Sequence, residues 1–360
     1  MLRNLQTKWW LFRGKRERAR KHSAEAIRYF EKALALDPQS VIALAQIGSC
    51  RYDLQEYAAA IDALEQALQR APNYSEVHAY LAQVYMTLKR YQEGYDSMQR
   101  AFRMQPRLKE NLYWLHVLGY CSGRIQRWQE AADIYQSSVN LDPKNANAWH
   151  GLGWAYANLN RDTEAVDSYE RAIELEPNNS TAHYELACTY AHRGELNKAV
   201  VALEQALRLE PNRVDYYCQL AGSYLRLEKH SESLQAAERA LRLDPNSADA
   251  HFCMGCALHE PGTFDKAVEA YVKSLALNPD QLEALGNLGD AYLQLGRAED
   301  AKNALTQAEK INSKDPKLHR LLGEVFLRLG DRNNASREYE ILKQLDCSLA
   351  EDLEKLMSGT

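Results

Sequence analysis

The chain has 360 residues, of which 46% are hydrophobic and 26% are charged, a composition that excludes an intrinsically disordered protein. Its formal net charge of −5 argues against a nucleic-acid partner, because binding to phosphates requires a positive surface. No run of about 18 apolar residues is present, and Arg13 follows the apolar residues 9–12 at once, so we expect a cytoplasmic protein without a membrane span or a signal peptide.

The first 22 residues form a basic segment. They contain eight Lys and Arg residues against one acidic residue, Glu17, which leaves about −12 for the remainder of the chain. Four apolar residues share one face of the helix predicted here: Leu2, Leu5, Trp9 and Phe12. Tryptophan beside basic residues suits an anionic membrane surface, so residues 1–22 are a candidate for peripheral attachment to the inner membrane face. The alternative is a basic end cap whose rings pack on the next part of the fold.

Prolines recur at intervals of 34 residues along most of the chain, with one interval of 37. They are Pro38, Pro72, Pro106, Pro143, Pro177, Pro211, Pro245 and Pro279. When each proline is taken as position 32 of a repeat, positions 8 and 20 hold only Gly, Ala or Ser. This register gives ten repeats, which begin at Thr7, Val41, Ser75, Leu112, Ala146, Ser180, Val214, Ala248, Leu282 and Pro316. A fixed period of this length predicts a solenoid.

Each repeat is predicted to form a hairpin of two helices. Apolar residues at positions 4, 7 and 11 follow the spacing of one helix face, and positions 24 and 27 continue a stripe on a second helix. The small residues at positions 8 and 20 allow the two backbones to approach closely. Proline at position 32 ends the second helix because it lacks an amide donor. A single hairpin cannot bury its apolar face, so the core must come from stacking of neighbours.

The repeat that starts at Ala146 resembles the tetratricopeptide repeat family. The matching residues are Trp149, Leu152, Gly153, Tyr156, Ala165, Tyr169, Ala172 and Pro177. The resemblance implies an all-α, right-handed superhelical solenoid of about ten helix-turn-helix repeats. It also implies a protein-protein interaction scaffold or adaptor, without catalytic activity or cofactor, that binds an extended peptide or a partner helix in a concave groove. The match is specific for the fold and does not identify the ligand.

The register divides the chain into five segments. They are residues 1–40, a basic N-terminal segment with an atypical first repeat; 41–108, repeats two and three; 109–111, an insertion; 112–349, repeats four to ten; and 348–360, a capping helix and tail. Ser348 and Glu351 have the spacing of a capping box, which predicts Ser348 as the N-cap of the last helix. Leu349, Leu353 and Leu356 would then cover the final repeat.

A second stripe on the first helix of each repeat, at positions 2, 5, 9, 12 and 13, is not needed for core packing. The family resemblance implies that this stripe lines the concave groove. In repeats four to six the candidate binding residues are Tyr113, His116, Tyr120, Arg124, Asn147, His150, Trp154, Asn158, Tyr184 and His192. Tyrosine, tryptophan and arginine are favoured at binding hot spots, so we expect a protein or peptide partner here. The alternative is that some of these rings only cover the edge of the core.

Two further functions remain open at this point. The first is a non-catalytic subunit of a membrane-associated or glycan-handling assembly, attached through the basic N-terminus. The second is a thiol or metal centre at Cys253 and Cys256, the one Cys-x-x-Cys pair among seven scattered cysteines. Because this pair is predicted to lie within a helix and has no second pair to complete a ligand set, we expect reduced thiols and no metal. No phosphate loop, nucleophile elbow or zinc-protease helix is present, which argues against an enzyme.

Overall fold

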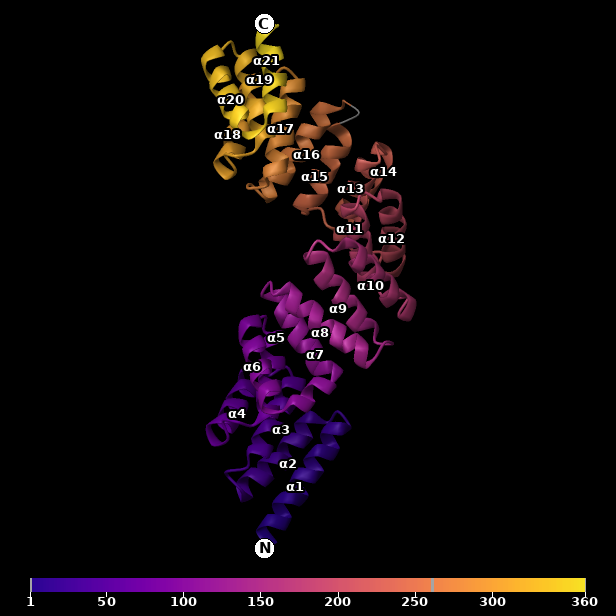
Figure 1. Ribbon diagram of the computed structural model, residues 1–360, viewed down its shortest axis with the longest axis vertical. Coiled ribbons are helices and arrows are strands. Elements are labelled where there is room, and N and C mark those ends of the chain that lie inside the picture. Colours follow the sequence, from indigo (N-terminus) through magenta and orange to yellow (C-terminus); the bar gives the residue numbers. More distant parts are fainter. Residues whose placement is uncertain (1, 260–261, 360) are drawn as a thin grey trace. The chain divides into compact units, whose positions relative to one another are not determined.

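The computed structural model describes residues 2–259 and 262–359. They form 21 α-helices and one short 3-10 helix, with no strand among these residues (Figure 1). The first helices of the ten hairpins are α1 (Leu2–Ala19), α3 (Val41–Asp53), α5 (Ser75–Thr87), α7 (Leu112–Arg124), α9 (Ala146–Asn158), α11 (Ser180–His192), α13 (Val214–Arg226), α15 (Ala248–His259), α17 (Leu282–Gln294) and α19 (Pro316–Arg328). The second helices are α2 (Ser23–Leu36), α4 (Tyr57–Arg70), α6 (Tyr91–Met104), α8 (Trp128–Leu141), α10 (Asp162–Leu175), α12 (Leu196–Leu209), α14 (His230–Leu243), α16 (Phe264–Leu277), α18 (Ala298–Ile311) and α20 (Arg332–Leu345).

The predicted all-α fold of tandem helical hairpins is confirmed. From Val41 onward, every first helix begins at the residue with which its repeat was predicted to begin. The first helix differs, because α1 begins at Leu2 and thus before Thr7. Two elements lie outside the hairpins: the 3-10 helix η1 (Pro106–Glu110) between α6 and α7, and the terminal helix α21 (Cys347–Ser358).

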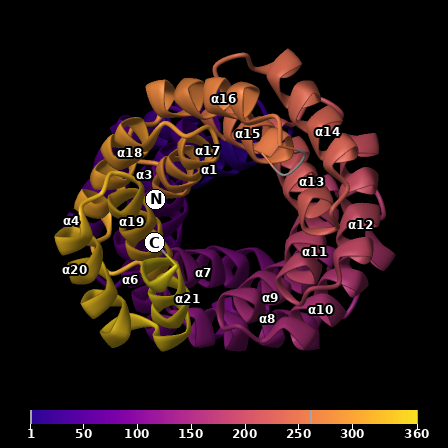
Figure 2. The ribbon, with the colours of Figure 1, turned by 90° about the horizontal axis from the view of Figure 1, so that it is seen from above.

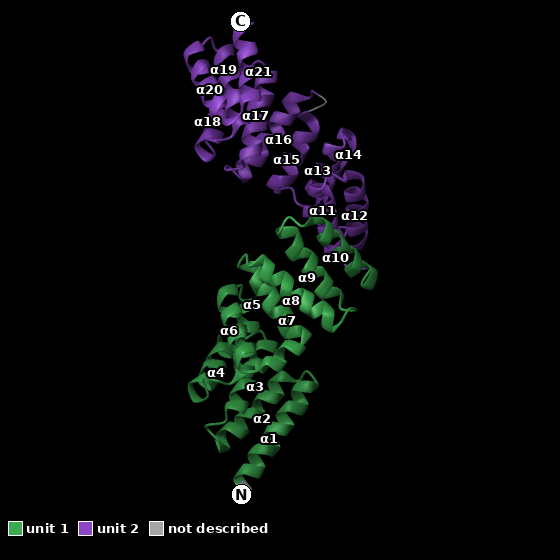
Figure 3. Ribbon diagram, viewed as in Figure 1, with its two compact units in different colours: residues 1–177 green, residues 178–360 purple. Residues whose placement is uncertain are grey.

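The chain divides into two compact units, residues 1–177 and residues 178–360 (Figure 3). Within each unit, a helix packs on its partner in the hairpin and on the helices of the adjacent hairpins, so contacting helices are neighbours or next neighbours in chain order. In unit 2, Figure 2 shows α13, α15, α17 and α19 along the inner side of the curved stack and α14, α16, α18 and α20 along its outer side. The first helices therefore provide the concave face of this unit.

Glycine at position 8 makes room for a bulky side chain on the second helix of the same hairpin. A Cβ atom added at Gly153 would lie 2.8 Å from the ring of Tyr169, and one added at Gly255 would lie 2.5 Å from the ring of Tyr271. Both tyrosines are completely buried. The space between the two helices is therefore filled by the side chain at position 24 of the repeat, whose ring lies directly over the glycine.

Among the described residues, the turn inside every hairpin contains one residue with a positive φ, between 56° and 79°. These residues are Lys21, Gln55, Lys89, Gln126, Asn160, Gly194, Glu228, Gly262, Gly296 and Gly330, all at position 15 of the repeat. Five of the ten belong to unit 1, and none of those five is glycine. Residues other than glycine rarely adopt a positive φ. At these sites, the need to join two packed helices therefore overrides the backbone preference of the residue.

The predicted N-cap of the last helix is wrong. Asp346, and not Ser348, caps α21: its Oδ1 accepts hydrogen bonds from the backbone amides of Ser348 at 3.0 Å and Leu349 at 3.2 Å. The helix begins at Cys347, and the extended backbone of Asp346 places its carboxylate over the first turn. Leu353 is completely buried, and an added Cβ at Gly323 of α19 would meet its side chain at 2.4 Å. The terminal helix therefore covers the last hairpin.

Candidate functional site

The ten predicted groove residues are divided between the two compact units. Eight of them lie on α7 and α9 of unit 1, and Tyr184 and His192 lie on α11 of unit 2.

In unit 1, four aromatic rings form a continuous set, here called the aromatic row: Tyr91, Tyr120, Trp154 and Trp128. The ring centres of Tyr120 and Trp154 are 5.8 Å apart, with the planes inclined by only 24°. Tyr91 meets the edge of Tyr120 at 5.8 Å, and Trp128 meets Trp154 at 4.9 Å. All four rings are half-buried. Their mutual contacts hold them in place while part of each ring stays accessible.

Gly123 explains how the indole of Trp154 fits against α7. A Cβ atom at this position would lie 2.3 Å from the Trp154 ring. Position 12 of the fourth repeat must therefore lack a side chain for the ring to reach its place between α7 and α9. The sequence pattern predicted Tyr120 and Trp154, but it missed Tyr91 and Trp128, which are the first residues of the second helices α6 and α8.

His116 and His150 lie beside the aromatic row on α7 and α9. The ring centre of His116 is 6.1 Å from that of Tyr120, and the ring of His150 is 5.7 Å from that of Tyr169. Burial lowers the pKa of both imidazoles, and the proximity of His116 lowers the pKa of His150 further. Nδ1 of His116 and Nε2 of His150 have no hydrogen-bond partner among the described residues. Both imidazoles are therefore neutral, and each has a buried nitrogen without a hydrogen-bond partner.

The remaining four predicted residues of unit 1 differ in their surroundings. Tyr113 is 43% exposed, and it interacts with Tyr52 of α3; burial of its hydroxyl raises its pKa. The guanidinium of Arg124 lies 5.0 Å from the ring centre of Tyr91. Asn147 is exposed, whereas Asn158 donates from Nδ2 to the carbonyl of Trp154 at 2.8 Å. The side-chain amide of Asn158 therefore already makes a hydrogen bond within its own helix.

A pocket of about 640 Å³ lies farther along the first helices of unit 1. Arg18 of α1 donates to Oε1 of Gln46 at 2.9 Å, and its guanidinium lies 5.6 Å from the ring of Tyr80. Tyr80 meets Trp114 edge-on at 5.9 Å. The sequence analysis missed this pocket, because Gln46 and Tyr80 are at position 6, Trp114 is at position 3 and Arg18 belongs to the atypical first repeat.

In unit 2, Tyr184 stacks on Tyr216 of α13, with ring centres 4.5 Å apart and planes inclined by 15°. Arg213 lies 4.3 Å from the centre of the Tyr216 ring. Tyr216 is completely buried, so Tyr184 is the accessible member of the pair. His192 is exposed at the C-terminal end of α11. The structure therefore places both predicted residues on the first helix of the sixth repeat, with one of them in a stacked pair.

The two cysteines of the Cys-x-x-Cys pair have different neighbours. The thiol of Cys253 lies 3.6 Å from the carbonyl oxygen of Cys218, and that of Cys256 accepts a hydrogen bond from Asn287 at 3.4 Å. The interaction with Cys218, together with burial, raises the pKa of Cys253. His259 approaches a carboxylate, with Nε2 3.2 Å from Oδ2 of Asp290, instead of a thiol. The arrangement favours a protonated thiol at Cys253, which is a poor nucleophile and a poor metal ligand.

The chain matches family models along most of its length. The model described as the C-terminal domain of cilia and flagella-associated protein 70 matches residues 73–253, and two models described as tetratricopeptide repeat match residues 13–75 and 258–325. No curated protein matches the sequence. Among the described residues, none of the helices is sufficiently long and apolar to cross a membrane.

Two solved structures are similar in fold. The crystal structure of the hetero-tetramer Cut9-Hcn1 of the APC/C is 15% identical, covers 96% of this chain and 89% of its own, and has a TM-score of 0.54. The structure of PilW, a type IV pilus biogenesis factor, is 22% identical, covers 59% of this chain and 98% of its own, and has a TM-score of 0.54. These structural similarities show a shared solenoid fold. At identities this low they do not indicate which ligand the chain binds.

Proposed function

Because the chain belongs to the tetratricopeptide repeat family, we propose that it is a non-catalytic scaffold or adaptor that binds an extended peptide or a partner helix on the face formed by its first helices. The main contact surface in unit 1 is the aromatic row together with Tyr113, His116, Arg124, Asn147 and His150. In unit 2 it is Tyr184 and His192. The observation that carries this proposal is the stacking of Tyr120 on Trp154 across two consecutive first helices.

The aromatic row suits recognition for an energetic reason. Binding normally orders flexible side chains, at a cost of about 0.5–1.5 kcal/mol for each one. The four rings are already held by one another, so little of this cost remains when a partner covers them. The exposed amide of Asn147 adds a polar contact that fixes the orientation of a peptide backbone.

The test is a pull-down from cell lysate with the full chain and two sets of variants. One variant combines Tyr120→Ala and Trp154→Ala in unit 1, and the other combines Tyr184→Ala and His192→Ala in unit 2. Tyr339→Ala serves as the control, because this tyrosine is half-buried on the second helix α20. Circular dichroism first establishes that every variant keeps its helical content.

We expect the unit 1 variant to lose a partner that the wild type and the control both retain. Loss of hot-spot rings typically weakens binding by about 2 kcal/mol or more each, roughly thirtyfold. If all variants capture the same proteins as the wild type, recognition takes place on another surface and the assignment to the first helices is wrong.

A second candidate function rests on α1, which supports attachment to an anionic membrane surface through residues 1–22. Leu5, Trp9 and Phe12 are 61%, 49% and 63% exposed, whereas Trp10 packs on Tyr29 of α2. At 100° per residue, the three exposed side chains fall within an arc of about 60°. The side chain of Leu2, the fourth residue of the predicted face, lies outside the described residues. In this function, the chain is a non-catalytic, peripheral subunit of a membrane-associated assembly, on the cytoplasmic side.

This second function is tested by sedimentation with vesicles of phosphatidylserine and of phosphatidylcholine. The full chain should bind the anionic vesicles, and the double variant Leu5→Gln, Phe12→Gln should lose that binding because the apolar contribution is removed. Val201→Gln changes an equally exposed residue on α12 and should have no effect. Unchanged sedimentation of the double variant, or of a chain lacking residues 1–12, would contradict attachment through α1.

A further inference from the structure

The three inserted residues, Lys109 to Asn111, lengthen the connection between the third and fourth hairpins. This connection folds as η1, and Leu108 packs against the buried core of α6 and α7. The ammonium of Lys109 lies 6.0 Å from the ring centre of Phe102 on α6. Lys109 of the insertion thereby lines one side of a pocket against α6.

This pocket has a volume of about 530 Å³ and lies between α6, α7 and α8. Its apolar lining consists of Phe102, Leu115, Leu118, Ile134 and Leu141. Leu115 and Leu118 form a buried floor, whereas Leu141 at the end of α8 is half-exposed. A volume of this size falls within the range of about 300–1,000 Å³ that is usual for binding pockets, so it accepts a large side chain.

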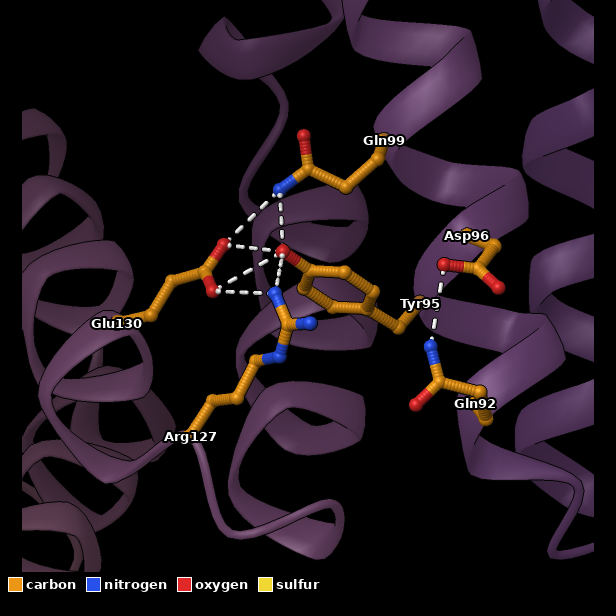
Figure 4. Close-up of polar contacts among 6 residues, drawn as sticks. All are labelled: Gln92, Tyr95, Asp96, Gln99, Arg127 and Glu130. Carbon is orange, nitrogen blue, oxygen red and sulfur yellow. Dashed lines mark hydrogen bonds and ion pairs between the residues drawn. The ribbon is translucent and has the colours of Figure 1, made fainter.

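One edge of the pocket is fixed by a hydrogen-bond network between α6 and α8 (Figure 4). The carboxylate of Glu130 accepts hydrogen bonds from the hydroxyl of Tyr95 at 2.8 Å and from Nε2 of Gln99 at 2.9 Å. Arg127 donates to the Tyr95 oxygen at 2.8 Å and lies 3.5 Å from the same carboxylate. Glu130 is therefore held in one position, with its charge partly offset by Arg127.

A second carboxylate, Asp133, lies one turn farther along α8 and also lines the pocket. It is exposed, it accepts a hydrogen bond from Gln129 at 2.9 Å, and no ion pair holds it among the described residues. Against these two carboxylates, the pocket lining contains one cation, Lys109. Because Arg127 already offsets part of the charge of Glu130, Asp133 is, among the described residues, the exposed carboxylate that remains without an ion pair beside the apolar floor.

We propose that this pocket is a docking site for an amphipathic helix of a partner protein that inserts a large apolar side chain and places an arginine or lysine beside Asp133. An apolar anchor flanked by a cation on one helix matches the apolar floor and the exposed carboxylate in the lining of the pocket. The site is independent of the first-helix surface described above. The scaffold thereby binds two partners at once, one on each face of unit 1.

The test uses two synthetic helical peptides of about 15 residues, each with leucines at helical spacing on one face. One carries arginines beside the leucines and the other carries glutamates. Fluorescence polarisation measures their binding to the full chain and to the variants Asp133→Lys, Leu141→Gln and Asp96→Lys. Asp96→Lys is the matched control: Asp96 is exposed on α6, and Figure 4 shows it on the opposite side of the Tyr95 ring from Glu130.

We expect the arginine peptide to bind and the glutamate peptide not to bind. Asp133→Lys should weaken binding of the arginine peptide about fivefold, and Leu141→Gln should weaken it by a similar factor. Asp96→Lys and the double variant Tyr120→Ala, Trp154→Ala should leave binding of this peptide unchanged. Equal weakening by Asp133→Lys and Asp96→Lys would reveal only general attraction to an acidic chain and would overturn the proposal. Absence of binding, or its loss in the Tyr120, Trp154 variant, would overturn it as well.

Discussion

His319 and Glu338 form an ion pair that is almost completely buried between α19 and α20. Nδ1 of His319 lies 2.6 Å from Oε2 of Glu338, and Nε2 lies 2.9 Å from the carbonyl oxygen of Ser313. The two residues are only 2% and 5% exposed. Burial alone would lower the pKa of His319, but the hydrogen bonds to Glu338 and to the Ser313 carbonyl outweigh it and raise this pKa. The folded chain therefore favours a charged imidazole here.

This pair predicts a pH-dependent stability. Because the folded pKa of His319 lies above its unfolded value of about 6.5, its contribution is complete below that pH and is lost as the pH rises through the folded pKa. Urea unfolding followed by circular dichroism should show this loss of stability as the pH rises above about 6.5. Glu338→Gln should lower stability by about 3 kcal/mol at pH 6 and remove this part of the pH dependence. An unchanged pH profile in the variant would contradict the assigned charge state.

At the level of single residues, the sequence predicted which first-helix positions carry rings but not what those rings contact. Tyr120 and Trp154 were identified from their spacing, whereas their neighbours Tyr91 and Trp128 start second helices and have no place in a first-helix pattern. Asn158 shows the opposite limit. It satisfies the spacing, yet its amide donates to its own helix. The spacing in the sequence indicates on which side of a helix a residue lies. The contacts of its side chain depend on the residues of the adjacent hairpin, which the spacing does not give.

The helices themselves were largely predictable, because proline and the small-residue positions repeat with the same period as the structure. The turns were less so. Position 15 is left-handed in all ten hairpins, although the residues there in unit 1 are lysine, glutamine and asparagine. Nothing in these side chains favours a positive φ strongly enough to be read from the sequence, and the geometry follows from two packed helices that must be joined.

The turn residues lead to a prediction with a matched control. Gln55→Gly should stabilise the chain by about 1 kcal/mol, because glycine adopts the left-handed conformation without the steric cost that glutamine has. Gln66→Gly, the same substitution on the exposed face of α4, should destabilise it by about 1 kcal/mol. Urea unfolding of the two variants measures both changes. Destabilisation by Gln55→Gly would show that the glutamine side chain has a role in the turn.

For the whole molecule, the number of hairpins followed from the sequence, but the division into two compact units did not. The boundary falls after Pro177, where the repeat register continues without a change in length or residue type. A periodic pattern is the same at each repeat, so it cannot indicate where one compact unit ends and the next begins.

The two units can be followed separately during unfolding. All six tryptophans, the last of which is Trp154, belong to unit 1. Tryptophan fluorescence therefore reports on unit 1 alone, while circular dichroism at 222 nm reports on the helices of both units. Since stability in a solenoid is a sum of local terms, we expect the two urea transitions to differ in midpoint. Coincident transitions would mean that the units unfold as one cooperative body.

The restriction of helix contacts to neighbours and next neighbours has a consequence for synthesis of the chain. Within a unit, each hairpin after the first finds a packing partner in the repeat made just before it, so no helix must wait for a distant segment to leave the ribosome. Contacts between segments close in sequence also favour rapid folding. Growth of the stack can thus keep pace with translation, and only the most recently made hairpin exposes its apolar face to the cell.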